Sequence, residues 1–400
     1  MTPRSIHEME ISGRRLVIRA DLNMPMKAGR VTDTTRIERF AGGLKPLLAK
    51  GASAVILSHL GRPDGNRSVE LTLEPVAEVL GEFLDSPVAF TSVISGAVAS
   101  KIAAGLRAGE VLVCENLRFD PREEANCATL GAELAELGDI FVNDAFSCAH
   151  RAHASTVAIS DFLPSAAGPL MLAEIEALQQ ALEVPERPAV ALVGGSKVSS
   201  KIDVLTHLVG KIDALIVGGG MANTFLAASG VPMGKSLHEP GQFETVREIL
   251  AAARASGCEI ILPVDIVWSD RLETGATAHI AEIGDCPEHG MILDAGPRSI
   301  ERIWNVIGTA KTILWNGPLG AFEIEPFEHA TQVVAIEVAR LTREGAIRSI
   351  AGGGDTVAAL NATGVTDDFT YVSTAGGAFL EWLEGKELPG VAALRSLQQT

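Results

Sequence analysis

Short runs of apolar residues recur along the whole chain, and each is followed by glycine or polar residues and then by an amphipathic stretch. The runs are nearly continuous in aliphatic residues instead of alternating with polar ones. Strands buried on both faces have this pattern, which is typical of a parallel sheet covered by helices. The expected strands lie at residues 15–23, 54–63, 111–119 and 140–146, and then at 189–195, 214–220, 259–268, 312–318 and 349–355.

Amphipathic stretches suited to helices separate these runs, for example Thr72–Leu84, Ala128–Leu137 and Phe327–Leu341. Alternating strands and helices predict an α/β fold with right-handed crossovers. We expect two such sheets, one in each half of the chain, with a boundary near residues 165–188. A helix over Met171–Leu182 precedes the sequence VPERP there, whose prolines end it before the next strand.

The composition narrows the choice of partners, because the chain carries a formal net charge of −17. Such a surface disfavours nucleic acid and anionic membranes, so an anionic ligand would need a local basic cluster. The N-terminal residues lack the apolar segment of a signal peptide, and no apolar run is long enough to span a membrane. Five scattered cysteines without a CxxC pair favour a reducing compartment. We therefore expect a cytoplasmic protein.

Ligands of open α/β sheets bind outside the carboxyl ends of the strands. In the first half of the chain these positions carry polar and charged side chains, and arginine forks bind phosphate and carboxylate groups well. A single surface arginine more often only solubilises a protein, but four near strand ends favour a small polyanion site. The residues concerned are Asp21, Asn23, Arg36, His59, Arg62, Arg118 and Arg151.

In the second half the strand ends carry glycines instead, which let backbone N–H groups approach a phosphate at a helix N-terminus. Lys197 and Lys201 follow the first glycine pair at positions i and i+4, so we expect them to share one helix face. Two lysines alone would more often be a solvated face. Asp355 follows the third glycine cluster, where a carboxylate could hold Mg²⁺. This half therefore predicts a nucleotide site. The glycines are Gly194-Gly195, Gly218–Gly220, Gly352–Gly354 and Gly376-Gly377.

Two familiar nucleotide motifs are incomplete. A Walker A loop ending at Gly234-Lys235-Ser236 would need glycine where the chain has Ser229, and a dinucleotide GxGxxG would need glycine at Asn223. An NAD-dependent oxidoreductase is thereby disfavoured. A non-catalytic anion-binding scaffold on the same fold stays open.

Eight segments, in order along nearly the whole chain, resemble the phosphoglycerate kinase family. They are VIRADLNMP (17–25), SHLGRPDG (58–65), ENLRF (115–119), NDAFSCAHRAHAST (143–156), GGSKVSSKI (194–202), WNGPLGAFE (315–323), GGGDT (352–356) and STAGGAFLEWLEGKELPG (373–390).

The resemblance implies two Rossmann-like three-layer domains whose parallel sheets face each other across a cleft. Residues 1–170 would bind 3-phosphoglycerate or 1,3-bisphosphoglycerate, and residues 189–385 would bind ADP or ATP with Mg²⁺. Residues 171–188 would form a connecting helix and hinge, and residues 386–400 a tail that returns to the first domain. The implied activity is reversible phosphoryl transfer between 1,3-bisphosphoglycerate and ADP in glycolysis, by a hinge-bending monomer.

The resemblance also assigns roles residue by residue. Both reacting oxygens are already anionic at neutral pH, so no general base is expected, and catalysis would come from positioning and charge stabilisation. The implied catalytic groups are Arg36, Lys197, Gly353 and Gly376. The triose would contact Asp21, Asn23, Arg36, His59, Arg62, Arg118 and Arg151. The nucleotide would contact Lys201, Asn316, Glu323, Gly353, Gly354, Asp355 and Thr356, with Asp355 on the metal.

The chain departs from the family pattern at a few positions. Tyr371 stands where the family usually has histidine, and Ala375 replaces the first glycine of a usual triplet. Ser147-Cys148 replaces a commoner Gly-Thr pair. Ile292 stands where a glycine often lines the nucleotide pocket, so the contacts to the base are expected to differ.

Overall fold

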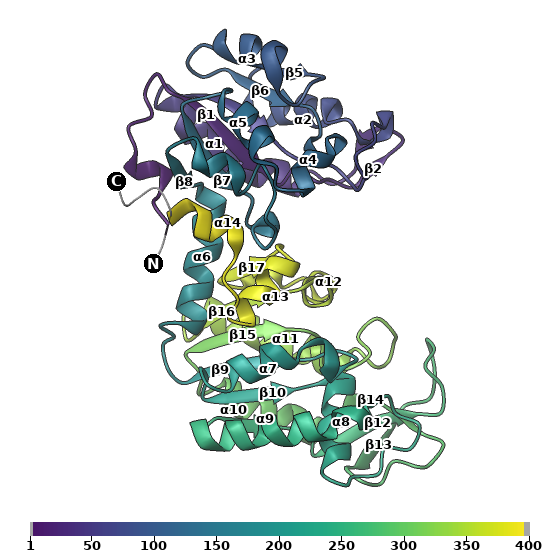
Figure 1. The fold of residues 1–400 in the computed structure, drawn as a ribbon. Coiled ribbons are helices and arrows are strands. Elements are labelled where there is room, and N and C mark those ends of the chain that lie inside the picture. The colour runs from purple at the N-terminus through teal and green to yellow at the C-terminus, as the bar shows by residue number, and fades with distance from the viewer. Residues whose placement is uncertain (1–2, 396–400) are drawn as a thin grey trace. The chain divides into compact units, whose positions relative to one another are not determined.

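The computed structural model describes residues 3–395, which divide into two compact units (Figure 1). Unit 1 contains the residues up to Ile175 together with those from Glu387 onward, and unit 2 contains Glu176–Lys386. The chain therefore passes between the units twice, once within helix α6 (Pro169–Leu182) and once at Lys386–Glu387. Within residues 3–395, none of the helices has both the length and the apolar character needed to cross a membrane.

Unit 1 is built on a six-stranded parallel sheet with the order β5-β6-β4-β1-β7-β8. The central strands are buried at almost every position, as the continuous apolar runs predict. The strands are β1 (Arg15–Ala20), β4 (Ser53–Leu57), β5 (Val88–Thr91), β6 (Val111–Cys114), β7 (Ile140–Asp144) and β8 (Ser165–Ala167), and a short hairpin joins β2 (Met26–Lys27) to β3 (Arg30–Val31).

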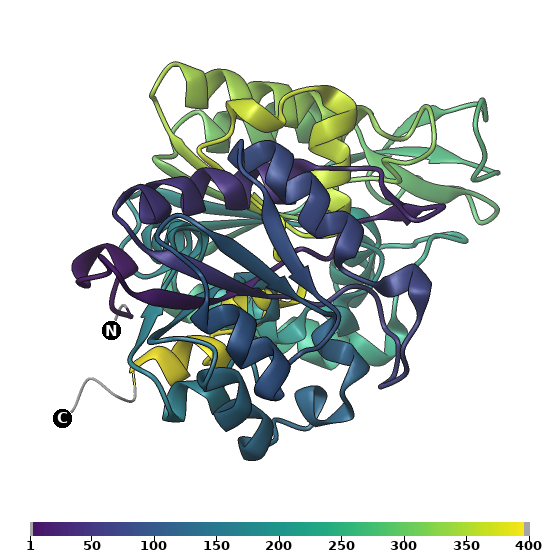
Figure 2. The ribbon, with the colours of Figure 1, turned by 90° about the horizontal axis from the view of Figure 1, so that it is seen from above.

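Helices lie on both sides of the unit 1 sheet (Figure 2). Leu16 and Ile18 of β1 share one apolar core with Phe40 of α1 and Leu80 of α2. Successive side chains of a strand point to opposite faces, so Arg19 lies on the other face. The helices of this unit are α1 (Thr35–Ala49), α2 (Glu74–Leu84), α3 (Gly96–Ala104), α4 (Pro121–Glu124), α5 (Ala128–Ala135), the start of α6, and α14 (Pro389–Ala392) from the returning tail.

The tail completes the buried surface of unit 1. Leu388, Val391 and Leu394 are each no more than 2% exposed. Gly390 N donates to the carbonyl oxygen of Ala149 at 2.8 Å, and its own carbonyl oxygen accepts from the side chain of Asn143 at 3.2 Å. Residues from the two ends of the sequence therefore share one folded unit.

Unit 2 has its own six-stranded parallel sheet, with the order β11-β10-β9-β15-β16-β17. Trp315 and Ile313 of β15 pack in one core with Ile303 and Val334. The strands are β9 (Ala189–Val193), β10 (Ala214–Val217), β11 (Glu259–Ile261), β15 (Thr312–Asn316), β16 (Arg348–Gly352) and β17 (Tyr371–Ser373), with α7 (Ile202–Leu208), α8 (Gly219–Ala228), α9 (Phe243–Ser256), α10 (Pro297–Ile307), α11 (His329–Arg343), α12 (Gly354–Thr363) and α13 (Gly377–Leu383).

The prediction of two parallel α/β sheets is confirmed, but one predicted strand is wrong. Residues 259–268 form two strands, β11 and β12 (Asp265–Ser269), in different sheets. Pro263 lies between them, and proline cannot donate to a strand ladder. Strand β12 belongs to a separate antiparallel sheet with β13 (His279–Glu282) and β14 (Met291–Ala295).

Candidate active site

The strand order of unit 1 places the predicted polyanion residues at one edge of its sheet. Strands β6, β4, β1 and β7 are neighbours. The side chains that follow their carboxyl ends are those singled out in the sequence. Because parallel strands end at the same edge, the loops after these four strands converge there.

Arg36, in the first turn of α1, is held against the end of β1. Its Nη1 donates to Asp21 Oδ2 at 2.9 Å and to the carbonyl oxygen of Asn23 at 3.1 Å. Asp21 Oδ2 also accepts from the Ser147 hydroxyl at 2.6 Å, and Asn23 Oδ1 accepts from Gly61 N at 2.9 Å. The Arg36 side chain stays 35% exposed, so further N–H donors of its guanidinium remain accessible to an anion.

An arginine that sequence reasoning missed lies beneath these residues. Arg19 is only 1% exposed, and it donates to Ser155 Oγ at 2.9 Å and to His59 Nδ1 at 3.1 Å. A guanidinium cannot accept a hydrogen bond, so His59 must be neutral with Nδ1 as the acceptor. Burial and the charges of Arg19 and Arg118 hold the pKa of His59 well below its usual value. The signal in the sequence was a charged residue inside an otherwise apolar run.

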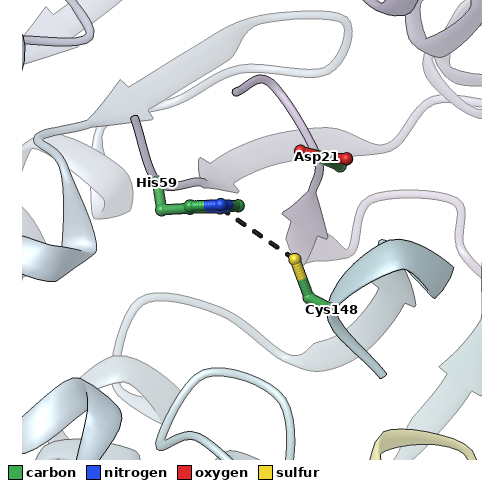
Figure 3. Close-up of side chains that lie close together, drawn as sticks. All are labelled: Asp21, His59 and Cys148. Carbon is green, nitrogen blue, oxygen red and sulfur yellow. Dashed lines mark hydrogen bonds between the residues drawn. The ribbon is translucent and has the colours of Figure 1, made fainter. Parts of the chain in front are cut away.

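Asp21, His59 and Cys148 offer three potential metal ligands within 4.8 Å of one another (Figure 3). The neighbouring charges argue against a cation. Arg19 Nη2 lies 3.6 Å from the Cys148 sulfur and also contacts His59, and Arg36 forms an ion pair with Asp21. Burial raises the pKa of the Cys148 thiol, which disfavours the thiolate form that binds metals. The surroundings of this cluster suit an anion.

The other three predicted residues of unit 1 differ in burial. Arg118 is 9% exposed and donates to the carbonyl oxygen of Gly61 at 2.7 Å. Arg62 and Arg151 are exposed, and Arg151 Nε donates to His150 Nε2 at 3.2 Å. Unit 1 thus combines buried and exposed cationic groups at one sheet edge.

The turns at the sheet edge of unit 2 are packed backbone against backbone. A Cβ atom on Gly194 would lie 1.8 Å from the carbonyl oxygen of Pro318, and one on Gly219 would lie 2.8 Å from that of Gly195. Gly219 has a φ of +64°, and its N–H donates to the carbonyl oxygen of Leu319 at 2.8 Å. Only glycine permits these contacts without displacing the neighbouring chain.

The expectation that Lys197 and Lys201 share a helix face is wrong. A 3₁₀ turn over Val198–Ser200 separates them, and helix α7 begins only at Ile202. Lys197 is exposed, whereas Lys201 Nζ turns inward and donates to the carbonyl oxygens of Gly194 at 2.7 Å and Asn316 at 3.0 Å. Burial lowers the pKa of Lys201 to about 8.

Asn316 and Thr356, both 2% exposed, connect the ends of β15 and β16. Asn316 Nδ2 donates to the carbonyl oxygen of Gly352 at 2.7 Å, and Thr356 Oγ1 accepts from Gly317 N at 2.6 Å. Gly353, with a φ of +98°, leads into α12. These side chains therefore fix the backbone of two adjacent turns.

The remaining predicted residues of unit 2 surround open space. Gly354 and Asp355 begin α12 and are exposed, as is Glu323, and Gly376 precedes α13 with a φ of +55°. A cavity of about 510 Å³ is lined by Glu323, Asp355 and glycines of the turns after β9 and β10. Apolar side chains complete its wall, among them Leu226, Leu237, Leu272, Ile292 and Phe322.

The cavity has the composition of a nucleotide pocket. Mostly apolar walls with a few polar groups are typical of sites for organic ligands. The glycine turns would bring backbone N–H groups to phosphates. Ile292, the unusual residue noted in the sequence, is part of the wall, and its N–H donates to Ser236 Oγ at 2.8 Å.

Comparisons with known proteins agree with this geometry. Residues 6–386 match the family model described as phosphoglycerate kinase. The chain is 54% identical over 396 residues to a phosphoglycerate kinase of Rhizobium meliloti, covering 99% of both chains. It is 52% identical to one of Cereibacter sphaeroides, covering 98% of this chain and 99% of the relative.

Solved structures give the same result. The fold matches phosphoglycerate kinase from Coxiella burnetii with a TM-score of 0.92 and 42% identity, covering 98% of this chain and 99% of that one. It matches the enzyme from Pyrococcus horikoshii with a TM-score of 0.76 and 30% identity, covering 98% of both. With strand-end arginines in one unit and a glycine-lined cavity in the other, the chain belongs to the phosphoglycerate kinase family of phosphotransferases.

Proposed function

We propose that the chain catalyses reversible phosphoryl transfer between 1,3-bisphosphoglycerate and ADP, giving 3-phosphoglycerate and ATP. The observation that carries this proposal is that the sheet edges of the two units carry different chemical groups. Unit 1 offers arginine side chains suited to a small polyanion. Unit 2 offers a cavity of about 510 Å³ between glycine turns, suited to a nucleotide.

Each group has a defined part in the proposed reaction. Arg36, steadied by Asp21, and Lys197, exposed on the loop after β9, would contact the oxygens of the phosphoryl group in transfer. The N–H groups of Gly353 and Gly376 would add donors without charge. The residues that would hold the triose are Asn23, His59, Arg62, Arg118 and Arg151.

The residues that would bind the nucleotide, or fix the turns around it, are Lys201, Asn316, Glu323, Gly354 and Thr356. Neither reacting oxygen needs a base.

Mg²⁺ fits the donors of the nucleotide cavity. Asp355 and Glu323 both line it and are exposed, and carboxylate oxygens are the ligands that hard cations prefer. Bound with the nucleotide, the metal would offset phosphate charge. Asp355→Asn should raise the Mg²⁺ concentration for half-maximal activity several-fold, because an amide is a poorer ligand. Asp367→Asn, a change of an exposed acid that is not among the residues lining the cavity, is the control. An unchanged Mg²⁺ titration for Asp355→Asn would remove this residue from the metal site.

In-line transfer requires reacting atoms to approach within roughly 3–3.5 Å. Because the two candidate sites belong to different units, we propose that turnover includes a hinge motion at the two passages of the chain, within α6 and at Lys386–Glu387. Small-angle scattering should show compaction with 3-phosphoglycerate plus a MgATP analogue, and much less with either ligand alone. Equal compaction with one ligand, or none with both, contradicts this motion.

We further propose that the protein is a monomer in the cytoplasm, and the five free cysteines support a reducing compartment. A coupled assay for 3-phosphoglycerate-dependent formation of ADP from ATP tests the central proposal. A purified, folded chain that binds both ligands without turnover would instead be an anion-binding scaffold.

A further inference from the structure

Asp294 is one of the residues that line the nucleotide cavity, and its carboxylate has no part in the reaction as described so far. The residue is 4% exposed, near the end of β14. Its Oδ2 accepts from Ala330 N, in the first turn of α11, at 2.9 Å, and its Oδ1 accepts from Ala295 N at 2.9 Å. One side chain thus connects the end of a cavity strand to the start of a helix.

The same carboxylate is packed against Gly320. A Cβ atom on Gly320 would lie 2.2 Å from Asp294 Oδ1 and 2.8 Å from the carbonyl oxygen of Phe327. Gly320 belongs to the segment Pro318–Ile324, which forms one wall of the cavity and carries Glu323. The position of this wall therefore depends on the position of the carboxylate.

Two further hydrogen bonds fix the segment to the elements that Asp294 joins. Leu319 N donates to Thr331 Oγ1 of α11 at 3.0 Å, and Ala321 N donates to the carbonyl oxygen of Leu293 of β14 at 2.8 Å. The carbonyl oxygen of Leu319 accepts from Gly219 N, at the start of α8. A shift of α11 relative to β14 would therefore displace both the segment Pro318–Ile324 and the turn at Gly219.

We propose that Asp294 is a positioning residue for the nucleotide: it ties α11 to β14 and thereby sets the segment Pro318–Ile324 and the Gly219 turn around the ligand. This inference rests on the proposed function, since it takes the cavity to be the nucleotide site. Both carboxylate oxygens of Asp294 accept hydrogen bonds from backbone N–H groups of β14 and α11, so the residue acts by fixing the segment.

Burying a carboxylate is energetically unfavourable, and the two backbone donors that Asp294 contacts offset that cost at this position. Burial raises the pKa of Asp294 to about 7, while the N–H groups of Ala330 and Ala295 lower it and the nearby Glu328 raises it further. A buried carboxylate is tolerated where donors meet it. Both donors here belong to the elements that need to be joined.

Unit 1 contains a similar construction, and none of its residues lines the candidate nucleotide cavity. Asp144, at the end of β7, is 5% exposed, and its Oδ1 accepts from Leu170 N at 2.7 Å and Met171 N at 3.1 Å in the first turn of α6. A Cβ atom on Gly168 would lie 2.3 Å from that oxygen. Burial raises the pKa of Asp144 to about 7 as well. Asp144 is therefore the control for Asp294.

The test compares Asp294→Asn with Asp144→Asn in the full chain. Calorimetric titration gives the Kd for ADP, steady-state kinetics give KM for each substrate, and denaturant unfolding gives stability. An amide loses one charge-assisted bond, so D294N should raise the Kd and KM for the nucleotide about tenfold. Its kcat at saturating nucleotide and its KM for 3-phosphoglycerate should stay within about twofold of wild type. D144N should lose similar stability with unchanged nucleotide constants.

Unchanged nucleotide constants in D294N, or an equal rise in D144N, would overturn the inference. If D294N does not fold, Gly320→Ala provides the same readout, because its Cβ pushes the carboxylate and the segment apart, and Gly168→Ala is its counterpart in unit 1. A wild-type chain that binds no ADP would overturn the proposed function and this inference with it. Wild-type binding with an unaffected D294N and G320A overturns this inference alone.

Discussion

The candidate sites of the two units would contact an anionic ligand through different chemical groups, although both lie at the carboxyl edge of a parallel sheet. At the sheet edge of unit 1, the candidate groups are side chains, with Arg36 and Arg118 held by hydrogen bonds to neighbouring residues. At the sheet edge of unit 2, they are mainly backbone groups of turns such as Gly194-Gly195 and Gly218–Gly220. Charge dominates the first site and shape dominates the second.

This difference determines how each site can be damaged. Removing atoms from an arginine in unit 1 deletes a charged donor, while the backbone stays in place. In unit 2, the donors belong to the main chain, so truncation of side chains affects them only indirectly. Adding one carbon to a glycine there drives the turns apart, because Gly194 and Gly219 are already in contact with the opposite backbone.

The largest effect is expected from Arg36→Ala. In the proposed mechanism, the change removes a charged hydrogen-bond donor that contacts the phosphoryl group in transfer, so kcat should fall by at least ~10²-fold. Stability should change little, since the side chain is partly exposed. Steady-state kinetics and denaturant unfolding measure both quantities. Arg39→Ala, an exposed position on the same helix, is the control and should leave turnover unchanged. Near-normal turnover of the Arg36 variant would remove it from the catalytic role.

The two lysines of unit 2 should separate into a catalytic and a structural group. Lys197→Ala should lower kcat roughly 10–10²-fold without loss of stability, because Lys197 is exposed. Lys201→Ala should mainly raise the nucleotide KM. It should also lower the free energy of unfolding by about 1–3 kcal/mol, because the carbonyl groups of Gly194 and Asn316 lose their donor. Identical kinetic and unfolding profiles would contradict this division.

Gly219→Ala should damage unit 2 by addition of a single carbon. Its Cβ would meet the carbonyl oxygen of Gly195 at 2.8 Å, so the nucleotide KM should rise about tenfold or more, whereas the KM for 3-phosphoglycerate should not. Gly230→Ala is the matched control. Gly230 also has a positive φ, +91°, but has open space around it, so both variants share a backbone cost of roughly 1–2 kcal/mol. Equal nucleotide constants in the two variants would refute the role of close packing.

The smallest expected effect is a difference in pH dependence. Lys201, with its pKa lowered to about 8 by burial, loses its charge as the pH rises from 7 to 9, so the nucleotide KM should rise several-fold. Arginines stay charged there, and the KM for 3-phosphoglycerate should be flat. Stability responds in the opposite direction. Between pH 8 and 10.5 the unfolded chain holds more protons at this residue than the folded chain, so its contribution to the unfolding free energy increases with pH. A nucleotide KM that stays constant from pH 7 to 9 would contradict the role of the Lys201 charge.

The parallel sheets could be predicted from the sequence because their central strands are buried on both faces. Residues 189–193, for example, are all apolar and form β9, and residues 312–316, which form β15, are polar only at their two ends. The small antiparallel sheet gave no such signal. Its strand β13 (His279–Glu282) is mostly exposed, so no apolar pattern marks it. Pro263, which lies between β11 and β12, is a single interruption of a mostly apolar run.

From the sequence, the candidate site could be predicted only where its residues follow the carboxyl ends of the strands. The rule found Asp21, His59 and the glycine turns, because it depends on topology alone. It missed Arg19, whose partners Ser155 and His59 come from distant parts of the chain. It also misplaced Lys201, because the start of α7 depends on a turn that spacing does not reveal.

The returning tail sets the order in which the protein can be completed during synthesis. Leu388, Val391 and Leu394 are buried in unit 1, yet the ribosome adds them after all of unit 2. At ~5–20 residues per second, the more than 200 residues between Ile175 and Glu387 take roughly 10–40 s. During that interval the N-terminal part of the nascent chain keeps an apolar surface that its own last residues will cover. Unit 1 thus begins first and is finished last.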